Sequence, residues 1–361
     1  MSDVELPVLA EVRNRIGHLT LNRPAGLNAL NLPMIRLLAQ QLQAWEQDSQ
    51  VLAVVLRANG EKAFCAGGDI RALYDSYKAG DGEHQIFFEE EYALDQYIHG
   101  YSKPLIALMD GFVLGGGMGL VQGASMRVVT ERVRMGMPEV AIGYFPDVGG
   151  SYFLSRLPGE LGIYLGVTGT QIRAADALYT ELADWCLSSE QIPELDRCLD
   201  NLSWNTHPRE TLRTLLATLG TSRMPGAELK AWRLAIDEYF ALPDLPAIRA
   251  ALLAESRPEF ADWAEETVKL LDSRSPLSMS VTLEMLRRGR TLPLADCFAL
   301  ELHLDRQWFA NGDIMEGVRA LIVDKDKSPR WNPPTLDSVS AEHINRFFAG
   351  FKPLGKVRRA G

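Results

Sequence analysis

The sequence predicts an α/β fold with largely parallel strands, followed by a mostly helical C-terminal region. Short β-branched runs alternate with helix-like stretches in the first half of the chain, and glycine-rich turns follow two of them. Strand-like runs nearly vanish after about Trp185. Strands alternating with helices are typical of α/β domains with a parallel sheet. We therefore expect an α/β core over residues 1–195 and a helical region over residues 196–361.

The strand predictions follow in chain order. The segment Val8–Leu21 alternates enough to predict a hairpin, with Arg13 and Asn14 at its turn. Short continuous apolar runs are typical of strands that are buried on both faces. Such runs occur at Val51–Arg57, Lys103–Met109 and Met126–Thr130.

Helices are predicted between and after these strands. Asn31 is suited to an N-cap and Pro33 to the first turn of the helix that follows. Three further helix-like stretches of the first half are Ile70–Lys78, Glu83–His99 and Gly116–Gln122. Helical patterns in the second half cover Pro208–Leu219, Ala227–Phe240, Pro246–Glu255, Ala261–Leu271 and Pro276–Arg287.

Composition excludes several classes of function. The 361 residues are 47% hydrophobic and 23% charged, as in an ordinary globular protein, and the formal charge of −10 argues against nucleic acid as a partner. No apolar run is long enough to span a membrane, and the N-terminus lacks the pattern of a signal peptide. The four cysteines form no CxxC pair and the six histidines no cluster, so we expect no metal site and a cytoplasmic location.

Two glycine-rich turns look suited to exposing backbone N–H groups. Cys65–Asp69 reads CAGGD and leads into a helix-like stretch, which favours binding an anion or a developing oxyanion. A tight turn with Asp69 as helix cap explains the same residues equally well. Gly115–Gly119 reads GGGMG and fits no dinucleotide fingerprint, so it is either a second oxyanion donor or a close helix–sheet contact.

Two carboxylates, Glu139 and Asp147, lie in the apolar and glycine-punctuated stretch Met137–Leu154, which contains no Lys and no Arg. A desolvated carboxylate must find a partner, shift its pKa or take part in chemistry. The alternative is that Glu139 stabilises the start of a helix and that Asp147 caps the helix after Gly149. Carboxylates together with exposed amides suggest an enzyme that acts on a carbonyl group.

Four motifs, in this order, resemble the crotonase (enoyl-CoA hydratase/isomerase) superfamily. They are LNRPAGLNALN, AFCAGGDIR, KPLIALMDGFVLGGGMGL and MPEVAIGYFPDVGG, and they cover roughly residues 17–169. Glu316–Trp331 also looks like the closing segment of that superfamily. The resemblance implies a spiral of ββα units with two roughly perpendicular sheets, followed by helices. Features such as GGD and FFEEEY make the chain most similar to superfamily members that hydrolyse hydroxyacyl-CoA thioesters.

The resemblance also implies roles for particular residues. Backbone N–H groups of Gly68 and Gly116 would hold the thioester oxygen, while Glu139 would attack the carbonyl or activate water. Asp147 would contact the acyl hydroxyl and assist the chemistry. The substrate-binding positions would be Glu91, Gly67 and Asp69.

One departure from the hydratases favours hydrolysis. Their two catalytic glutamates match Gly119 and Glu139 here, so the first carboxylate is absent, and adding water to a double bond needs an acid and a base together. An isomerase, a hydrolase of another 3-hydroxyacyl-CoA and a noncatalytic acyl-CoA-binding protein remain alternatives. The expected partner is an acyl-CoA substrate, with no separate cofactor, no nucleic acid and no membrane. By family we expect a homo-oligomer, a trimer or a hexamer.

Overall fold

The computed structural model describes residues 6–221 and 225–354, so the first five residues, on which the expectation of no signal peptide partly rests, lie outside it. The chain divides into two compact units, each assembled from separate segments. Unit 1 comprises residues 1–69, 93–135 and 172–228, and unit 2 comprises residues 70–92, 136–171 and 229–361. This division by contacts differs from the sequential split at residue 195, which stays a prediction. The α/β class with a helical C-terminal region is confirmed.

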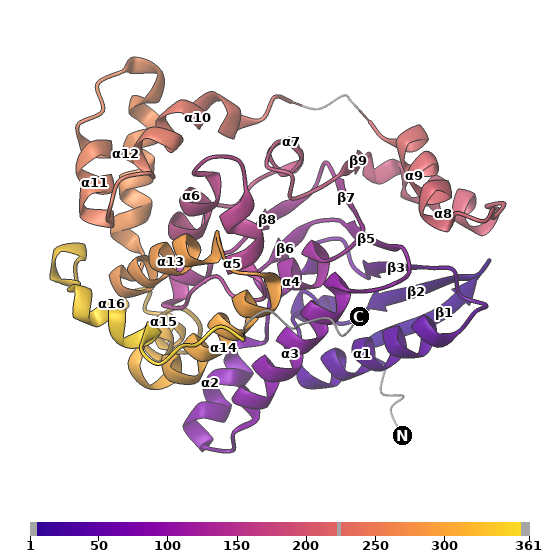
Figure 1. Cartoon of the computed structure of the whole chain (residues 1–361), viewed down its shortest axis with the longest axis horizontal. Helices are drawn as coiled ribbons and strands as arrows, with labels where there is room; N and C mark the ends of the chain where they lie inside the picture. Colours follow the sequence, from indigo (N-terminus) through magenta and orange to yellow (C-terminus); the bar gives the residue numbers. More distant parts are fainter. Residues whose placement is uncertain (1–5, 222–224, 355–361) are drawn as a thin grey trace. The chain divides into compact units, whose positions relative to one another are not determined.

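Unit 1 is built on a six-stranded sheet with the strand order β1-β2-β3-β5-β7-β9 (Figure 1). β1 and β2 pair antiparallel, and all later neighbours in this sheet pair parallel. A second sheet has the order β4-β6-β8. The strands are β1 Val8–Arg13, β2 Ile16–Leu21, β3 Ala53–Ala58, β4 Ala63–Cys65, β5 Leu105–Met109, β6 Phe112–Leu114, β7 Met126–Thr130, β8 Arg134–Gly136 and β9 Trp185–Leu187.

The first α-helix of unit 1, α1, begins at the N-cap residue that the sequence predicts. Asn31 caps α1 by accepting a 3.1 Å hydrogen bond from the Met34 N–H. A Cβ on Gly17 of β2 would lie 2.4 Å from the Trp45 ring of α1, so glycine at this position permits their close contact. The helical elements of this unit are η1 Pro24–Gly26, α1 Leu32–Gln47, α4 Gly116–Gln122, α7 Ala174–Tyr179, η4 Ser189–Gln191, α8 Ile192–Asp200 and α9 Pro208–Leu219.

The predicted hairpin is confirmed, but its turn lies one residue later than expected. Asn14 and Arg15, not Arg13 and Asn14, connect the strands, with φ values of 43° and 64°. Positive φ at both central residues is the conformation that two-residue hairpin turns favour, and asparagine adopts it more readily than most residues.

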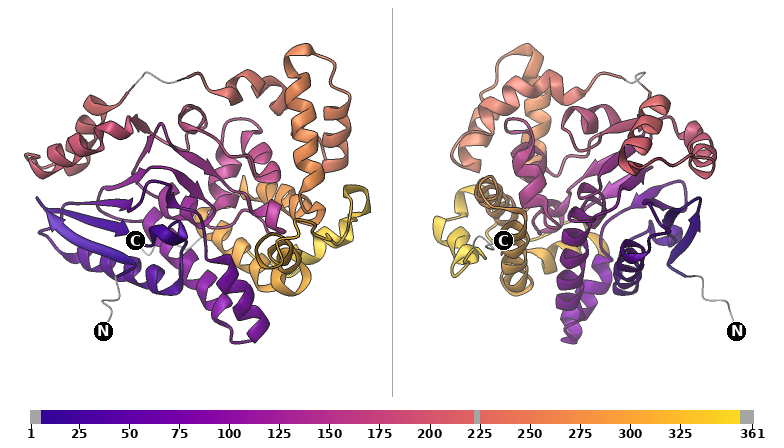
Figure 2. Two further views of the ribbon diagram at one scale, coloured as in Figure 1. Left: turned by 180° about the vertical axis from the view of Figure 1, so that it is seen from behind. Right: turned by 45° about the vertical axis from the view of Figure 1, so that its right-hand side comes forward.

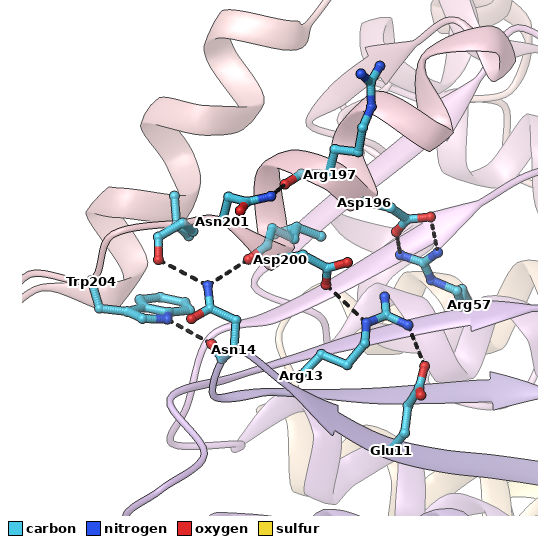
Figure 3. A network of polar contacts seen from close by, with 11 residues as sticks. Glu11, Arg13, Asn14, Arg57, Asp196, Arg197, Asp200, Asn201 and Trp204 are labelled. Atoms are coloured by element: carbon cyan, nitrogen blue, oxygen red, sulfur yellow. Dashed lines mark hydrogen bonds and ion pairs between the residues drawn. The ribbon is translucent and has the colours of Figure 1, made fainter.

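Helix α9 packs on unit 1, although the sequence pattern assigns it to the helical region that follows. Helix α8, which has no counterpart among the predicted helices, packs there too. Their leucines (Leu195, Leu199, Leu212, Leu216) share a buried core with side chains of the six-stranded sheet. Polar contacts fix α8 to the hairpin and to β3 (Figure 3): Arg13 of β1 pairs with Asp200 at 3.0 Å, and Arg57 of β3 pairs with Asp196 at 2.6 Å. Asn14 Nδ2 donates hydrogen bonds to the carbonyl oxygens of Leu199 and Leu202, at 2.8 and 3.0 Å.

Unit 2 is helical, and the five helices predicted beyond residue 207 are confirmed, the first of them, α9, in unit 1. Within unit 2, α11 and α12 lie side by side, and α13 packs against α6 (Figure 2). Its helical elements are α2 Ile70–Ala79, the first turns of α3 Glu83–His99, η2 Glu139–Ile142, α5 Gly150–Phe153, η3 Leu154–Arg156, α6 Leu161–Thr168, α10 Glu228–Tyr239, α11 Leu245–Leu253, α12 Pro258–Ser273, α13 Pro276–Gly289, α14 Leu294–Asn311, α15 Ile314–Val318, the π-helical turn Arg319–Val323, η6 Leu336–Ser338 and α16 Ala341–Phe348.

Across the part of the chain that the structure describes, no helix is both long and apolar enough to cross a membrane.

Candidate active site

Both glycine-rich turns of unit 1 follow strands of the three-stranded sheet. β4 and β6 pair in parallel, so the segments that leave their carboxyl ends emerge at the same edge. A Cβ added to Gly67 would lie 3.8 Å from the Gly116 nitrogen, and one added to Gly117 would lie 2.5 Å from the Cys65 carbonyl oxygen. The two turns are therefore in close contact. The close-packing interpretation of the second turn is correct for Gly117.

The first turn holds Gly68 in a defined orientation. Gly67 has φ of +104°, a conformation that favours glycine. The Leu30 N–H donates to the Gly67 carbonyl at 2.8 Å, and the Asp69 N–H donates to the Leu30 carbonyl at 2.8 Å. Because these two groups face Leu30, the N–H of Gly68 points to the opposite side of the segment.

The second turn places Gly116 at the first position of α4. The first N–H groups of a helix have no partner within the helix, and they carry the positive end of its dipole. Gly115, which precedes it, has φ of 49° and ψ of −119°. The N–H of Gly116 is thus a suitable donor to a developing oxyanion.

The two carboxylates of the stretch Met137–Leu154 are buried in unit 2. Glu139 is 7% exposed and begins η2, and Asp147 is 4% exposed in the loop that follows. The η2 turn is held from several sides: Trp308 Nε1 donates to the Gly143 carbonyl at 2.8 Å, and the Ser275 N–H donates to the Val140 carbonyl at 3.2 Å. These contacts fix the backbone that carries Glu139.

The Glu139 side chain is buried without a full set of hydrogen-bond partners among the described residues. Its Oε2 is buried and has no hydrogen-bond partner within residues 6–221 and 225–354. Burial, and secondarily the nearby Asp147, raise the pKa of Glu139 well above its ordinary value. An unpartnered buried carboxylate oxygen costs folding free energy, so a substrate or water is its natural partner.

Asp147 is stabilised by a tyrosine from α3. The Tyr92 hydroxyl donates to Asp147 Oδ2 at 2.6 Å. Burial raises the pKa of Asp147 to about 7, although the Tyr92 hydrogen bond acts in the opposite direction. A carboxyl that titrates near neutral pH suits proton transfer at that pH.

The alternative in which Asp147 caps the helix after Gly149 is wrong. That helix, α5, has Gly149 at its N-cap, and its free donors are satisfied by Glu301 of α14 instead. Glu301 accepts hydrogen bonds from the N–H of Gly149 at 2.7 Å and of Ser151 at 2.8 Å, and one from the Ser151 hydroxyl. The Asp147 carboxylate therefore does not cap α5.

Asp305 lies one helical turn after Glu301 on α14. It accepts a 2.7 Å hydrogen bond from the hydroxyl of Tyr144, which lies between Glu139 and Asp147 in the chain. Glu301 and Asp305 are almost completely buried, and burial raises the pKa of each to about 8. Two acids of this helix thus hold the segment that carries Asp147.

The remaining predicted site residues lie in both units. Glu91 is buried on α3, directly before Tyr92. Asp69 is partly exposed and lies 3.4 Å from Arg23 in an ion pair. The roles of Glu91, Gly67 and Asp69 in substrate binding stay predictions. No group of three or more potential metal ligands occurs among the described residues.

Four residues of the carboxylate cluster were missed from the sequence. Tyr92 and Tyr144 lie within the quoted motifs FFEEEY and MPEVAIGYFPDVGG, but nothing local indicates that their hydroxyls bond to acids. Glu301 and Asp305 could have been found from the sequence. Together with Phe298 and Trp308 they recur at helical spacing, which is the spacing of the buried face of α14. Acidic residues on such a face are rarely buried without a function or a partner.

The whole chain was compared with known proteins. A family model described as enoyl-CoA hydratase/isomerase matches residues 16–348. The 3-hydroxyisobutyryl-CoA hydrolase of Gallus gallus is 38% identical over 358 residues, which cover 98% of this chain and 91% of that protein. The human protein of the same name is 37% identical and covers 98% of this chain and 90% of its own length. The names of both relatives place them in mitochondria.

Solved structures show the same fold. A carnitinyl-CoA dehydratase from Mycobacterium thermoresistibile matches with a TM-score of 0.86 and 37% identity, over 97% of both chains. An enoyl-CoA hydratase from Rhodobacter sphaeroides matches with a TM-score of 0.84 and 36% identity, over 97% of this chain and 98% of its own. The names of all these relatives contain a coenzyme A compound, but they give different reactions: hydrolysis, hydration and dehydration.

Proposed function

Because this chain belongs to the enoyl-CoA hydratase/isomerase family, we propose that it hydrolyses the thioester of a 3-hydroxyacyl-CoA, with 3-hydroxyisobutyryl-CoA as the leading substrate. Such an activity would serve valine degradation. The observation that carries the proposal is the buried Glu139, whose Oε2 has no partner among the described residues, in a chain that has Gly119 at the position of the hydratases' other glutamate. One catalytic glutamate suffices to attack a thioester, whereas hydration of a double bond calls for two groups.

In the proposed reaction the Glu139 carboxylate attacks the thioester carbonyl and forms an enzyme-bound anhydride, which water then hydrolyses. Alternatively, Glu139 takes a proton from the water that attacks directly. The N–H groups of Gly68 and Gly116 stabilise the oxyanion. Loss of one such donor typically costs about 2.7–4 kcal/mol of transition-state stabilisation.

Asp147 supplies selectivity for the hydroxyl of the acyl group in this proposal. A site that hydrogen-bonds a substrate hydroxyl rejects the analogue without it by about 10⁴-fold or more, because its buried polar group loses its partner. Asp147 Oδ2 accepts from Tyr92, so its other oxygen is the one we assign to the substrate. Glu91 is proposed as a further substrate contact.

An acyl-CoA panel tests the proposal. The purified full-length chain is given 3-hydroxyisobutyryl-CoA, isobutyryl-CoA and an enoyl-CoA, while free thiol and loss or migration of the double bond are monitored. We expect thiol release that is fastest with the hydroxyacyl ester. Hydration without thiol release would instead assign the activity named for the hydratase relative, and double-bond migration without thiol release would assign an isomerase.

The variant Glu139→Gln tests the role of the glutamate. We expect thiol release to fall by about 10²–10⁴-fold, the usual contribution of such a group. The matched control is Glu284→Gln on α13, whose carboxylate pairs with Arg288 in a partly exposed position. Undiminished turnover in Glu139→Gln would show that Glu139 takes no part in the mechanism.

Location in the cytoplasm and the oligomeric state also stay proposals. Cell fractionation tests the location, and light scattering tests the oligomeric state.

A further inference from the structure

We propose that Glu301 is a positioning residue of this reaction: it holds the backbone turn after Asp147 in a strained conformation and so fixes the Asp147 carboxylate where it binds the acyl hydroxyl. The inference rests on the proposed function, in which Asp147 supplies the selectivity for that hydroxyl. Both residues belong to unit 2, and Glu301 lies on α14 of the helical C-terminal region. The proposal thus gives this region a role in the choice of substrate.

The turn formed by residues 147–150 has an unusual backbone. The Gly150 N–H donates to the Asp147 carbonyl oxygen at 2.7 Å, which closes the turn. Its central residues, Val148 and Gly149, have φ of 51° and 87°. Positive φ at both central residues belongs to type I′ turns, in which glycine, asparagine and aspartate predominate. A β-branched residue is an outlier in this region, so the turn is strained at Val148.

The carboxylate of Glu301 binds this turn directly. Its Oε2 accepts from the Gly149 N–H at 2.7 Å, and its Oε1 accepts from the Ser151 N–H at 2.8 Å. The Ser151 hydroxyl also donates to Oε1. Strained backbone persists only where the surrounding structure over-determines it. These three bonds, on both sides of Gly150, supply that constraint.

A second side chain of α14 packs on the same turn. A Cβ added to Gly149 would lie 3.0 Å from Phe298 Cζ, so the ring packs against this glycine. The ring centroids of Phe298 and Tyr92 are 6.1 Å apart. Tyr92 donates the hydrogen bond to Asp147 Oδ2. Helix α14 therefore contacts both the backbone beside Asp147 and the side chain that binds its carboxylate.

Helix capping alone does not require a buried acid. Serine, threonine and asparagine cap helices well without a charge, and α5 has four residues. Glu301 is 0% exposed and lies 150 residues from Ser151 in the chain. Burying a carboxyl group costs folding free energy that its bonds must offset. The cost is explained if the conformation of the turn matters for the reaction.

Both oxygens of Glu301 accept hydrogen bonds, which an amide cannot reproduce. Burial raises the pKa of Glu301 to about 8, and the bonds from Ser151 and Gly149 act in the opposite direction. In either charge state each oxygen keeps a lone pair for its donor. A glutamine has one accepting oxygen, so one of the two backbone N–H groups would face its NH₂ group. Glu301→Gln should therefore release one end of the turn.

Release of the turn should change the position of Asp147. Val148 would relax from φ of 51° to the ordinary negative range, and this rotation turns the neighbouring Asp147. A displacement of a reacting group by about 1 Å can cost about 10²-fold in rate. An ester without the acyl hydroxyl makes no contact with Asp147 in the proposed function. Only the hydroxyacyl ester should therefore lose this rate.

Kinetics with two esters test the inference. The ratio of kcat/KM for 3-hydroxyisobutyryl-CoA to kcat/KM for isobutyryl-CoA measures the selectivity for the hydroxyl. In Glu301→Gln we expect this ratio to fall by about tenfold to 10²-fold, with isobutyryl-CoA changed within about twofold. Asp147→Asn should lower the ratio at least as far. Equal losses with both esters in Glu301→Gln, or an unchanged ratio in either variant, would overturn the inference, because a purely structural role weakens both reactions alike.

Two further variants complete the kinetic test. Asp296→Asn is the matched control, because Asp296 is a buried acid of the same helix that accepts a 2.7 Å bond from the Leu354 N–H, and its ratio should stay within about twofold of wild type. Ser151→Ala removes one of the three donors to Glu301 and keeps both backbone bonds, so its ratio should fall by about threefold. Should Glu301→Gln not fold, judged by circular dichroism, an unchanged ratio in Ser151→Ala would overturn the inference.

Crystal structures test the position of Asp147 without using activity. The wild type should show positive φ at Val148 and the bond from Tyr92 to Asp147. In Glu301→Gln, or in Ser151→Ala if the former does not fold, the Asp147 carboxylate should shift, by about 1 Å where a backbone bond is lost. An Asp147 that stays in place would overturn the inference. If the wild-type chain releases no thiol from any ester, the proposed function fails, and these structures still decide whether Glu301 positions Asp147.

Discussion

The Tyr92 hydroxyl donates a 2.6 Å hydrogen bond to Asp147 Oδ2 and thereby joins α3 to the loop after η2. Hydrogen bonds to the charged form of an acid favour that form. This bond opposes the burial that raises the pKa of Asp147 to about 7. The protonation state of Asp147 is thus set by two opposing effects, one of which a single substitution removes.

Tyr92→Phe should therefore raise the pKa of Asp147 above about 7. The substitution keeps the ring contact with Phe88 and removes only the hydroxyl. The titration of Asp147 by carboxyl-carbon NMR is the measurement, with Tyr97→Phe as control, since that hydroxyl bonds to Glu46 in unit 1. A midpoint that stays in place, or moves down, would show that Tyr92 does not stabilise the carboxylate.

The stability of the protein should fall as pH rises from about 4 to about 8. Burial raises the pKa of Asp147 to about 7 and of Glu301 and Asp305 to about 8, whereas unfolded carboxyls titrate near 4. Between these values the folded state binds more protons at these three carboxyls than the unfolded state does, so their contribution to the free energy of unfolding decreases with pH and levels off above about 8. His18 and His99, whose pKa burial lowers to about 4, act in the opposite direction below about 6.5.

Asp305→Asn should flatten this pH dependence. One group can contribute up to about 1.4 kcal/mol per pH unit in this window. Thermal unfolding midpoints of wild type and variant at several pH values from about 5 to about 9 are the measurement. Asp272→Asn is the control, because that carboxylate is partly exposed and pairs with Arg249. Parallel curves for wild type and Asp305→Asn would contradict the raised pKa.

Gly117→Ala should reduce kcat by about 10²–10³-fold, the usual cost of losing one oxyanion donor. Its Cβ would lie 2.5 Å from the Cys65 carbonyl oxygen, which forces the two glycine turns apart. Gly226→Ala is the control, since a Cβ there meets nothing within 4 Å. Steady-state thiol release is the measurement, and a Gly117→Ala enzyme with wild-type kcat would exclude these turns from oxyanion binding.

Asn14→Ala should destabilise the protein by about 1–3 kcal/mol. The side chain donates to the carbonyls of Leu199 and Leu202, which would be left without this partner, and alanine tolerates φ of 43° less well. Urea unfolding followed by Trp204 fluorescence reports on this contact, because Trp204 Nε1 donates to the Asn14 carbonyl at 2.8 Å. Asn201→Ala, which removes an exposed hydrogen bond to Arg197, should change stability much less.

The strands and helices were predictable because their signals are local. Continuous apolar runs gave β3, β5 and β7 within two residues, and Asn31 acts as the predicted cap of α1. Where helices pack is not a local property. The sequence pattern of α9 indicates a helix, but only the buried leucines that α8 and α9 share with the sheet assign these two helices to unit 1.

The candidate site was predictable in part for the same reason. Glu139 and Asp147 stand out because they interrupt an apolar stretch, and both prove to be buried. The capping explanation for Asp147 fails because Glu301, 150 residues after Ser151 in the chain, accepts the hydrogen bonds at the start of that helix. No pattern near residue 147 could reveal an acceptor so distant in sequence.

The attachment of α8 to the hairpin turn has a consequence for synthesis on the ribosome. Asn14 and Arg13 obtain their partners only when Leu199, Asp200 and Leu202 have been made, some 185 residues later. The hairpin of unit 1 therefore lacks these contacts until α8 has been synthesised. Contacts between residues so far apart in sequence slow folding. A chain that stops after residue 195 would lack the partners of the hairpin at residues 199, 200 and 202. We therefore expect a truncated protein of residues 1–195 to be less stable than unit 1 of the full chain.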